Sequence, residues 1–184
     1  MTSVVVLPAG HSLHRFHAAG FDPVYFDRSR SGRLNAPDGT YDVMYTTMTV
    51  RGAFADTFLR HPGVNLIDDD RLRNRACARL EARSELHLVK LCGEGLGRLG
   101  ATAEVTHGGL PYDLPQEWSK ALRAAFPRMD GILYTARHDD EPQCHALFDH
   151  CSRRIVLRER IENLDEDWFR NIAEVSSVGK APPA

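Results

Sequence analysis

The chain has 184 residues, 42% of them hydrophobic and 26% charged, and a formal net charge of −2. This length suits one ordinary domain that buries its core without disulfides or metals. The near-neutral charge gives no electrostatic reason to expect nucleic acid or an anionic membrane as a partner. No apolar run approaches the roughly 20 residues that span a bilayer, and the apolar stretch 4–7 is too short for a secretory leader.

Short strands around a long polar loop are expected in the first third of the chain. Apolar and β-branched residues predict strands over residues 4–7, 13–17 and 41–47. The intervening segment 20–39 is rich in Gly, Pro, Asp, Ser and Arg, and ordered loops of this length are usually functional. Thr49 is placed to cap a helix that runs to about Arg60, and the His-Pro-Gly sequence at 61–63 ends it.

The middle of the chain is ambiguous. Asp68, Asp69 and Asp70 are placed to cap a helix that continues through Cys77 to Leu80, since carboxylates suit a helix N-terminus. Clustered carboxylates also occur at metal sites, but a solvated helix start is the preferred interpretation. A buried strand is expected over 86–91. The glycines at 93, 95, 97 and 100 contain no GxGxxG pattern and predict a flexible turn.

The last third mixes one clear helix with further strands. The helix begins at Pro115, and Trp118, Leu122 and Phe126 give it one apolar stripe. Strands are expected over 131–134, 144–148 and 154–157, followed by an amphipathic segment that carries Leu164, Trp168 and Ile172. Because helices and strands do not alternate strictly and no linker separates two cores, we expect a single α+β domain over residues 1–175, with a disordered tail over 176–184.

The four cysteines, at positions 77, 92, 144 and 151, form no CxxC pair and are widely spaced. This pattern suits neither a zinc site nor a disulfide framework, so buried, reduced thiols in a cytoplasmic protein and no bound metal are expected. The sequence also contains no GxSxG nucleophile motif and no HExxH metal motif. These absences argue against serine hydrolases of the elbow type and against metallohydrolases.

The stretch 32–58 holds the strongest candidate site. Within it, Arg33 lies in the loop, Tyr45 in the following strand and Asp56 in the helix. A cation, an aromatic hydroxyl and a carboxylate are the groups that a substrate with phosphates and a cationic ring requires. Each has an ordinary alternative: Arg33 as an exposed arginine, Tyr45 as a half-buried core tyrosine, and Asp56 in a helix-surface ion pair with Arg60.

A series of short blocks in a fixed order resembles the RES domain. The blocks are LHRF at 13–16, SGRLN at 31–35, VMY at 43–45, AFAD at 53–56, DGILYTARHD at 130–139 and ALF at 146–148. Together they extend over most of the chain, from residue 13 to about 157.

This resemblance implies an ADP-ribosyltransferase-like α+β fold with mixed sheets and flanking helices. It also implies that the protein consumes NAD, with phosphate, water or a protein side chain as acceptor. RES proteins are typically toxins of bacterial toxin–antitoxin pairs, neutralised by an Xre-type helix-turn-helix protein, so such a partner is expected here. A homo-oligomer is compatible with the sequence, which does not define an oligomeric state.

Carried onto this chain, the resemblance assigns catalysis to Arg33, Tyr45 and Asp56. It assigns NAD binding to Arg15, Phe16, Arg33, Asn35, Tyr45 and Ala136. Three positions depart from the family pattern: Asp56 stands for its glutamate, Ala136 for its serine, and Phe16 for a tyrosine that often follows the first arginine. A catalytically silent RES-fold protein that binds a nucleotide or a protein partner is the alternative.

Overall fold

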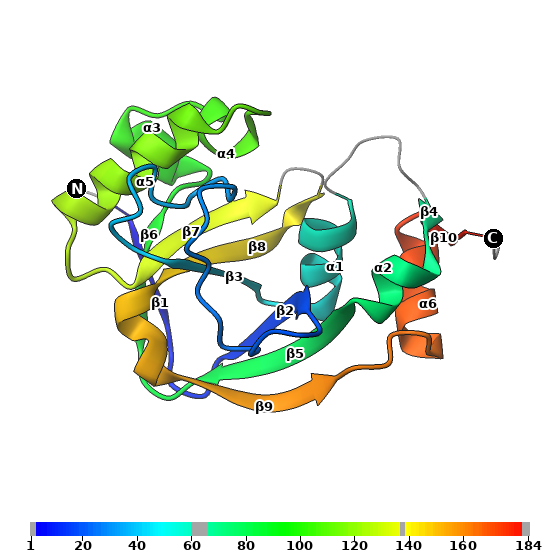
Figure 1. Cartoon of the computed structure of the whole chain (residues 1–184). Coiled ribbons are helices and arrows are strands. Elements are labelled where there is room, and N and C mark those ends of the chain that lie inside the picture. The colour runs from blue at the N-terminus through cyan, green and yellow to red at the C-terminus, as the bar shows by residue number, and fades with distance from the viewer. Residues whose placement is uncertain (1–2, 60–65, 137–138, 182–184) are drawn as a thin grey trace.

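An eight-stranded mixed sheet curls through the molecule and carries helices at both of its ends (Figure 1). This computed structural model describes residues 3–59, 66–136 and 139–181, the side chains of 139–142 excepted. The chain is thus a single α+β domain, as the sequence predicts.

The strand order in the sheet is β1-β6-β7-β8-β3-β2-β5-β9, and only the β6–β7 pair is parallel. The strands are β1 (Val4–Leu7), β2 (Ser12–Ala18), β3 (Val43–Thr47), β5 (Arg75–Ala82), β6 (Leu86–Lys90), β7 (Gly131–Ala136), β8 (Asp139–Phe148) and β9 (Ile155–Ile161). β1 lies at one edge of the sheet, and β2 and β3 occupy its interior, where both backbone edges are paired.

The helices form two groups, one at each end of the sheet (Figure 1). α3 (Glu94–Leu99), α4 (Glu104–His107) and α5 (Asp113–Ala125) gather beside β6 and β7. At the other end lie α1 (Val50–Phe58), α2 (Asp69–Arg73) and α6 (Asp167–Val175), together with a small parallel pair, β4 (Leu66–Ile67) and β10 (Gly179–Lys180). A 3₁₀ helix, Asp149–Arg154, joins β8 to β9. Within the described part of the chain, no helix is long and apolar enough to cross a membrane.

Aromatic packing attaches α1 and α6 to the sheet. Phe54 and Phe58 of α1 are fully buried, with ring centroids 5.0 Å apart, and each lies 5.4 Å from the ring of Phe169 in α6. Phe16 of β2 joins this cluster at 5.2 Å from Phe58. Fully burying a phenylalanine contributes about 1.5–3 kcal/mol, so the cluster holds α1 firmly against β2.

α1 begins where the sequence predicts. The Thr49 side chain accepts a hydrogen bond from the Gly52 N–H at 3.0 Å, which satisfies one of the free donors at the helix start. The helix ends at Phe58. Arg60 and the His-Pro-Gly sequence at 61–63, which was expected to end the helix, lie outside the described residues. All four cysteines are buried, as expected.

The prediction of a long helix from Asp68 to Leu80 is wrong. Asp68 does cap a helix, through a bond from the Arg71 N–H, but α2 ends at Arg73. Residues 75–82 instead form β5, which pairs with β2 on one side and β9 on the other. Alternating burial along this strand, with Leu80 fully buried, shows that cross-strand packing outweighs the local helical signal.

The prediction of a flexible turn at the glycines 93–100 is also wrong, because α3 occupies this segment. Gly95 is needed there for close approach: a Cβ atom would lie 2.1 Å from the Lys90 carbonyl oxygen. Leu96 and Leu99 pack against the core, and Gly100 ends the helix with a left-handed φ of 70°. Glycine therefore serves packing and capping in this segment.

The tail is ordered further than the sequence predicts. Val178 is buried, and β10 pairs with β4 at residues 179–180. Lys180 Nζ lies 3.0 Å from a carboxylate oxygen of Asp69 and 3.1 Å from one of Asp165. The prediction of a disordered tail from residue 176 is therefore wrong as far as residue 181. Residues 182–184 lie outside the described residues.

Candidate functional site

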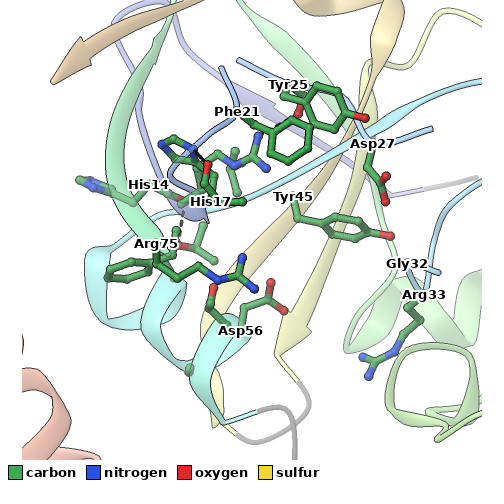
Figure 2. Close-up of a pocket in the computed structure, with 18 of the residues that line it drawn as sticks. His14, His17, Phe21, Tyr25, Asp27, Gly32, Arg33, Tyr45, Asp56 and Arg75 are labelled. Carbon is green, nitrogen blue, oxygen red and sulfur yellow. Dashed lines mark hydrogen bonds between the residues drawn. The ribbon is translucent and has the colours of Figure 1, made fainter. Parts of the chain in front are cut away.

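A pocket of about 510 Å³ opens between the sheet, α1 and the loop over residues 21–33 (Figure 2). Its floor comes from β2 and β3, one wall from α1 with Arg71 and Arg75, and another from Gly32, Arg33 and Tyr112. This volume lies in the range of small-molecule and cofactor sites.

Six of the seven residues assigned by the sequence analysis line this one pocket: Arg15, Phe16, Arg33, Tyr45, Asp56 and Ala136. They come from β2, the loop, β3, α1 and β7, which are far apart in the sequence. The seventh, Asn35, is 1% exposed and lies behind Tyr45. Arg137 and His138, from the block 130–139, are outside the described residues.

The Tyr45 hydroxyl fastens the loop to the sheet. It donates to Asn35 Oδ1 at 2.8 Å and accepts from the Leu34 N–H at 2.8 Å. The Asn35 amide nitrogen donates in turn to Asp27 Oδ2 at 2.8 Å and to the Ser29 carbonyl at 2.6 Å. Because the hydroxyl is used inside the protein, the ring of Tyr45 is the part left to contact a ligand. Asn35, which the resemblance assigned to NAD binding, does not line the pocket, and its side chain instead supports Tyr45.

Helix α5 fastens the same loop from behind. The Gln116 side-chain amide donates to the Arg30 carbonyl at 2.8 Å and to the Gly32 carbonyl at 2.9 Å. Ser119 Oγ donates to the Leu34 carbonyl at 2.7 Å. These bonds satisfy the backbone of an irregular segment and hold it in one conformation, which positions the neighbouring Arg33.

Gly32 is required by the close approach of the loop to Tyr45. A Cβ atom at this position would lie 2.3 Å from Asn35 Oδ1 and 2.7 Å from the Tyr45 hydroxyl. We expect Gly32→Ala to separate this hydrogen-bonded pair and to lower the free energy of unfolding by about 1–3 kcal/mol, measured by urea denaturation. Gly20→Ala, in the same loop, is the control because nothing lies within 4 Å of its Cβ position. Equal stability of the two variants would show that the loop yields without breaking the contact.

Arg33 extends from the loop toward α4. Its guanidinium donates to the Thr106 carbonyl and lies 5.4 Å from the ring centroid of Tyr112. Its buried Nε has no hydrogen-bond partner among the described residues. Arg33 thus forms one end of the pocket wall, with a buried N–H donor still unsatisfied.

Arg15 lies under the other part of the loop. Its Nη1 donates to the carbonyls of Pro23 at 3.2 Å and Tyr25 at 2.9 Å. Burial lowers the pKa of Arg15 to about 10, against the opposing charges of Asp27 and Asp56. Arg15 therefore remains a cation at neutral pH.

Asp27 lines the pocket near Arg15 and supplies a negative charge there. Burial raises its pKa, but hydrogen bonds from Ser29 and Asn35 and the charge of Arg15 outweigh this, and the net pKa lies below the usual range. Asp27 therefore stays ionised and keeps the loop and Arg15 together.

Asp56 lies on the face of α1 opposite the aromatic cluster, where it is half-buried and lines the pocket. Figure 2 shows it beside Arg75, below the ring of Tyr45. The small neighbours Ala53 and Ala55 line the same wall. The alternative ion pair with Arg60 involves a residue outside the described part of the chain.

Charges of both signs line the pocket. Its arginines are at positions 15, 33, 71 and 75, and its aspartates at 22, 27 and 56. This mixture suits a ligand that carries an anion and a cationic or electron-poor ring. Across the described residues, no group of three or more His, Cys, Asp or Glu side chains is arranged to hold a metal ion.

Two assigned residues contribute little polar chemistry. Phe16 lines the pocket but is 6% exposed, because most of its side chain packs in the aromatic cluster. Ala136, at the end of β7, is buried and presents a methyl group where the resemblance leads one to expect a hydroxyl.

Sequence reasoning missed several residues of the pocket: His17, Phe21, Tyr25, Tyr112 and Tyr134. The aromatic side chains of Phe21 and Tyr25, within a loop rich in polar residues, were the available signal. Their ring centroids lie 5.2 Å apart at the rim of the pocket, and both side chains are exposed.

Fold and pocket together define an α+β protein with a mixed sheet and a pocket that is lined by charged and aromatic side chains. Neither a protein-family model nor a curated protein matches this chain.

Proposed function

We propose that this chain is an NAD-consuming enzyme of the RES type that cleaves the bond between nicotinamide and ribose. One observation carries the proposal: Arg15, Arg33, Tyr45 and Asp56, from four separate segments, line a single pocket. The resemblance assigned all four residues to NAD on the sequence alone.

The chemistry requires three groups. Cleavage expels neutral nicotinamide with the bonding electrons and leaves an oxocarbenium-like ribose. Arginines hold the diphosphate, an aromatic face holds the cationic ring, and a carboxylate stabilises the positive charge that develops on the sugar. Here Arg33 and Arg15 are the phosphate or ribose ligands, and the Tyr45 ring, whose hydroxyl is bound to Asn35, contacts nicotinamide.

Asp56 is the charge-stabilising group of this proposal. It bonds a ribose hydroxyl and stabilises the sugar cation until phosphate, water or a protein side chain attacks the anomeric carbon and loses its proton. An aspartate is one methylene shorter than a glutamate, and a misplacement of about 1 Å costs on the order of 10²-fold in rate. The small residues Ala53 and Ala55 beside it leave the ligand free to approach α1 closely.

Incubation of the purified protein with NAD, with and without phosphate, tests the proposal. We expect nicotinamide release that depends on protein concentration, and the co-product identifies the acceptor: ADP-ribose for water, its 1″-phosphate for phosphate, or a modified protein. An absence of release in folded protein would reject the enzyme. The partner that the resemblance implies, an Xre-type helix-turn-helix protein, should inhibit this release.

A catalytically silent nucleotide-binding protein is the second candidate, favoured by the methyl group of Ala136 in the pocket. Binding of NAD without turnover, in a protein that Asp56→Glu does not activate, would establish it.

Restoring the hydroxyl by Ala136→Ser should raise turnover a few-fold, since one hydrogen bond contributes about 0.5–1.5 kcal/mol. The readout is the turnover rate at saturating NAD. Ala82→Ser, at a buried core site that does not line the pocket and pairs with Ile155 of β9, is the control for adding a hydroxyl and should leave turnover unchanged. An unchanged rate in a folded, NAD-binding Ala136→Ser variant would show that another donor serves this position.

A further inference from the structure

We propose that the end of the pocket formed by His17, Phe21 and Tyr25 is a subsite for an aromatic ring that bears an amino group. The identity of the ligand rests on the proposed function, in which the substrate is NAD. The ring with an amino group is then the adenine of NAD. The inference adds a recognition site at the end of the pocket away from Arg33, and its evidence comes from three side chains that the sequence analysis did not assign.

Phe21 and Tyr25 provide the stacking surface. Phe21 is 53% exposed and Tyr25 37% exposed, although both side chains are large and apolar. The short loop that carries them is fixed by a bond from the Val24 N–H to Asp22 Oδ1 at 2.7 Å and by Arg15 bonded to the Tyr25 carbonyl. Exposed aromatic faces that line a pocket on a fixed backbone are surfaces on which a base stacks.

His17 provides a hydrogen-bond acceptor. The side chain is 3% exposed and lines the pocket. Its Nδ1 lies 2.9 Å from the Ala18 carbonyl, which can only accept, so Nδ1 carries the proton. Burial lowers the pKa of His17, so the ring is neutral at neutral pH and Nε2 is an acceptor.

The His17 Nε2 atom is buried and has no hydrogen-bond partner within residues 3–59, 66–136 and 139–181. A buried acceptor without a donor is uncommon in folded proteins and points to a missing partner. Since the atom belongs to a residue of the pocket wall, an N–H group of a bound ligand is the partner that this position fits.

The acceptor and the stacking surface belong to one end of the pocket. The Ala18 carbonyl accepts a hydrogen bond from His17 Nδ1 and another, at 3.0 Å, from the backbone N–H of Phe21. These two bonds hold the His17 side chain and the backbone of Phe21 close to the same carbonyl. Figure 2 shows Phe21, Tyr25 and His17 together, with Arg33 at the far side of Tyr45. A ring stacked on Phe21 therefore lies within reach of the His17 imidazole.

The amino group decides which ring fits. At C6 of its planar ring adenine presents an amine donor, whereas hypoxanthine has there a carbonyl oxygen that repels the Nε2 lone pair, and the N1–H donor of hypoxanthine lies one ring position away. The nicotinamide carboxamide also carries N–H donors, on its amide nitrogen, but the proposed function places that ring at Tyr45 and Asp56. Adenine, at the other end of the same dinucleotide, is then the ring for the His17 end.

Calorimetric titration with AMP, IMP and nicotinamide mononucleotide tests the subsite separately from cleavage. We expect AMP to bind about tenfold more tightly than IMP, the factor that one hydrogen bond supplies. His17→Leu should remove this preference. Phe21→Leu keeps an apolar side chain but removes the aromatic face, and it should weaken AMP and IMP together by about 5- to 100-fold. Val175→Ala, at an exposed position of α6 outside the pocket, is the control and should change nothing.

Equal affinity for AMP and IMP, no AMP binding, or unchanged AMP binding in folded Phe21→Leu would overturn the subsite. Binding of nicotinamide mononucleotide that depends on His17 would overturn the assignment to adenine. Nicotinamide release is measured in parallel: a preference for AMP without release rejects the proposed function alone, and release without the preference rejects the subsite alone.

Discussion

Asp56→Asn is expected to abolish nicotinamide release from NAD and to leave the fold intact. The substitution keeps the size of a half-buried side chain on the pocket face of α1 but removes the charge that would stabilise the ribose cation. Loss of a preorganised electrostatic group costs on the order of 10²–10³-fold in turnover. Nicotinamide release gives the rate, and circular dichroism establishes that α1 and the sheet are unchanged.

Two companion variants sharpen this test. Asp70→Asn removes an exposed carboxylate of α2 that pairs with Arg73 outside the pocket, and turnover should not change. Asp56→Glu restores the length that the resemblance implies and should accelerate an enzyme limited by the reach of its carboxylate. Turnover at the parental rate in Asp56→Asn would place the chemistry on another residue.

Arg33→Ala is expected to weaken NAD binding by about 10- to 150-fold. Charge-assisted hydrogen bonds to a phosphate contribute about 1.5–3 kcal/mol, which corresponds to this range. The Thr106 carbonyl and the Tyr112 ring hold the guanidinium at the pocket wall, so its position is set before the ligand arrives. Arg33→Lys should recover part of the affinity, because it restores the charge but not the planar fork.

Isothermal calorimetry measures both Arg33 variants against a matched control. Arg28→Ala removes an arginine of the same loop that pairs with Asp42 at 2.9 Å and is 81% exposed, so NAD affinity should stay as in the parent. If Arg33→Ala and Arg28→Ala bind NAD equally well, Arg33 has no part in the site.

Local signals in the sequence predicted much of the fold. The Thr49 cap and the β-branched run of β3 depend on neighbouring residues, and both lie where they were expected. β5 and α3 were mispredicted because tertiary contacts decide them: two strand partners for β5, and the approach of Gly95 to β6 for α3. Such contacts have no counterpart in a local window of sequence.

The residues of the candidate site also fall into two groups, those that local sequence indicates and those that depend on tertiary contacts. Arg15, Arg33, Tyr45 and Asp56 were predicted from short blocks with a fixed order, and all four line one pocket. Asn35 was predicted to bind the same ligand but does not line the pocket, because its side chain bonds to the Tyr45 hydroxyl, a contact that exists only in the folded chain. His17 was missed for a similar reason, since an unpaired buried nitrogen is a property of the fold and not of composition.

The most direct test of the central claim is nicotinamide release from NAD by the parent protein, measured with Asp56→Asn beside it. Release should rise in proportion to the parent protein and fall to background in the variant, while both proteins give the same thermal unfolding curve. Release that is absent from the folded parent, or equal in parent and variant, would contradict this claim.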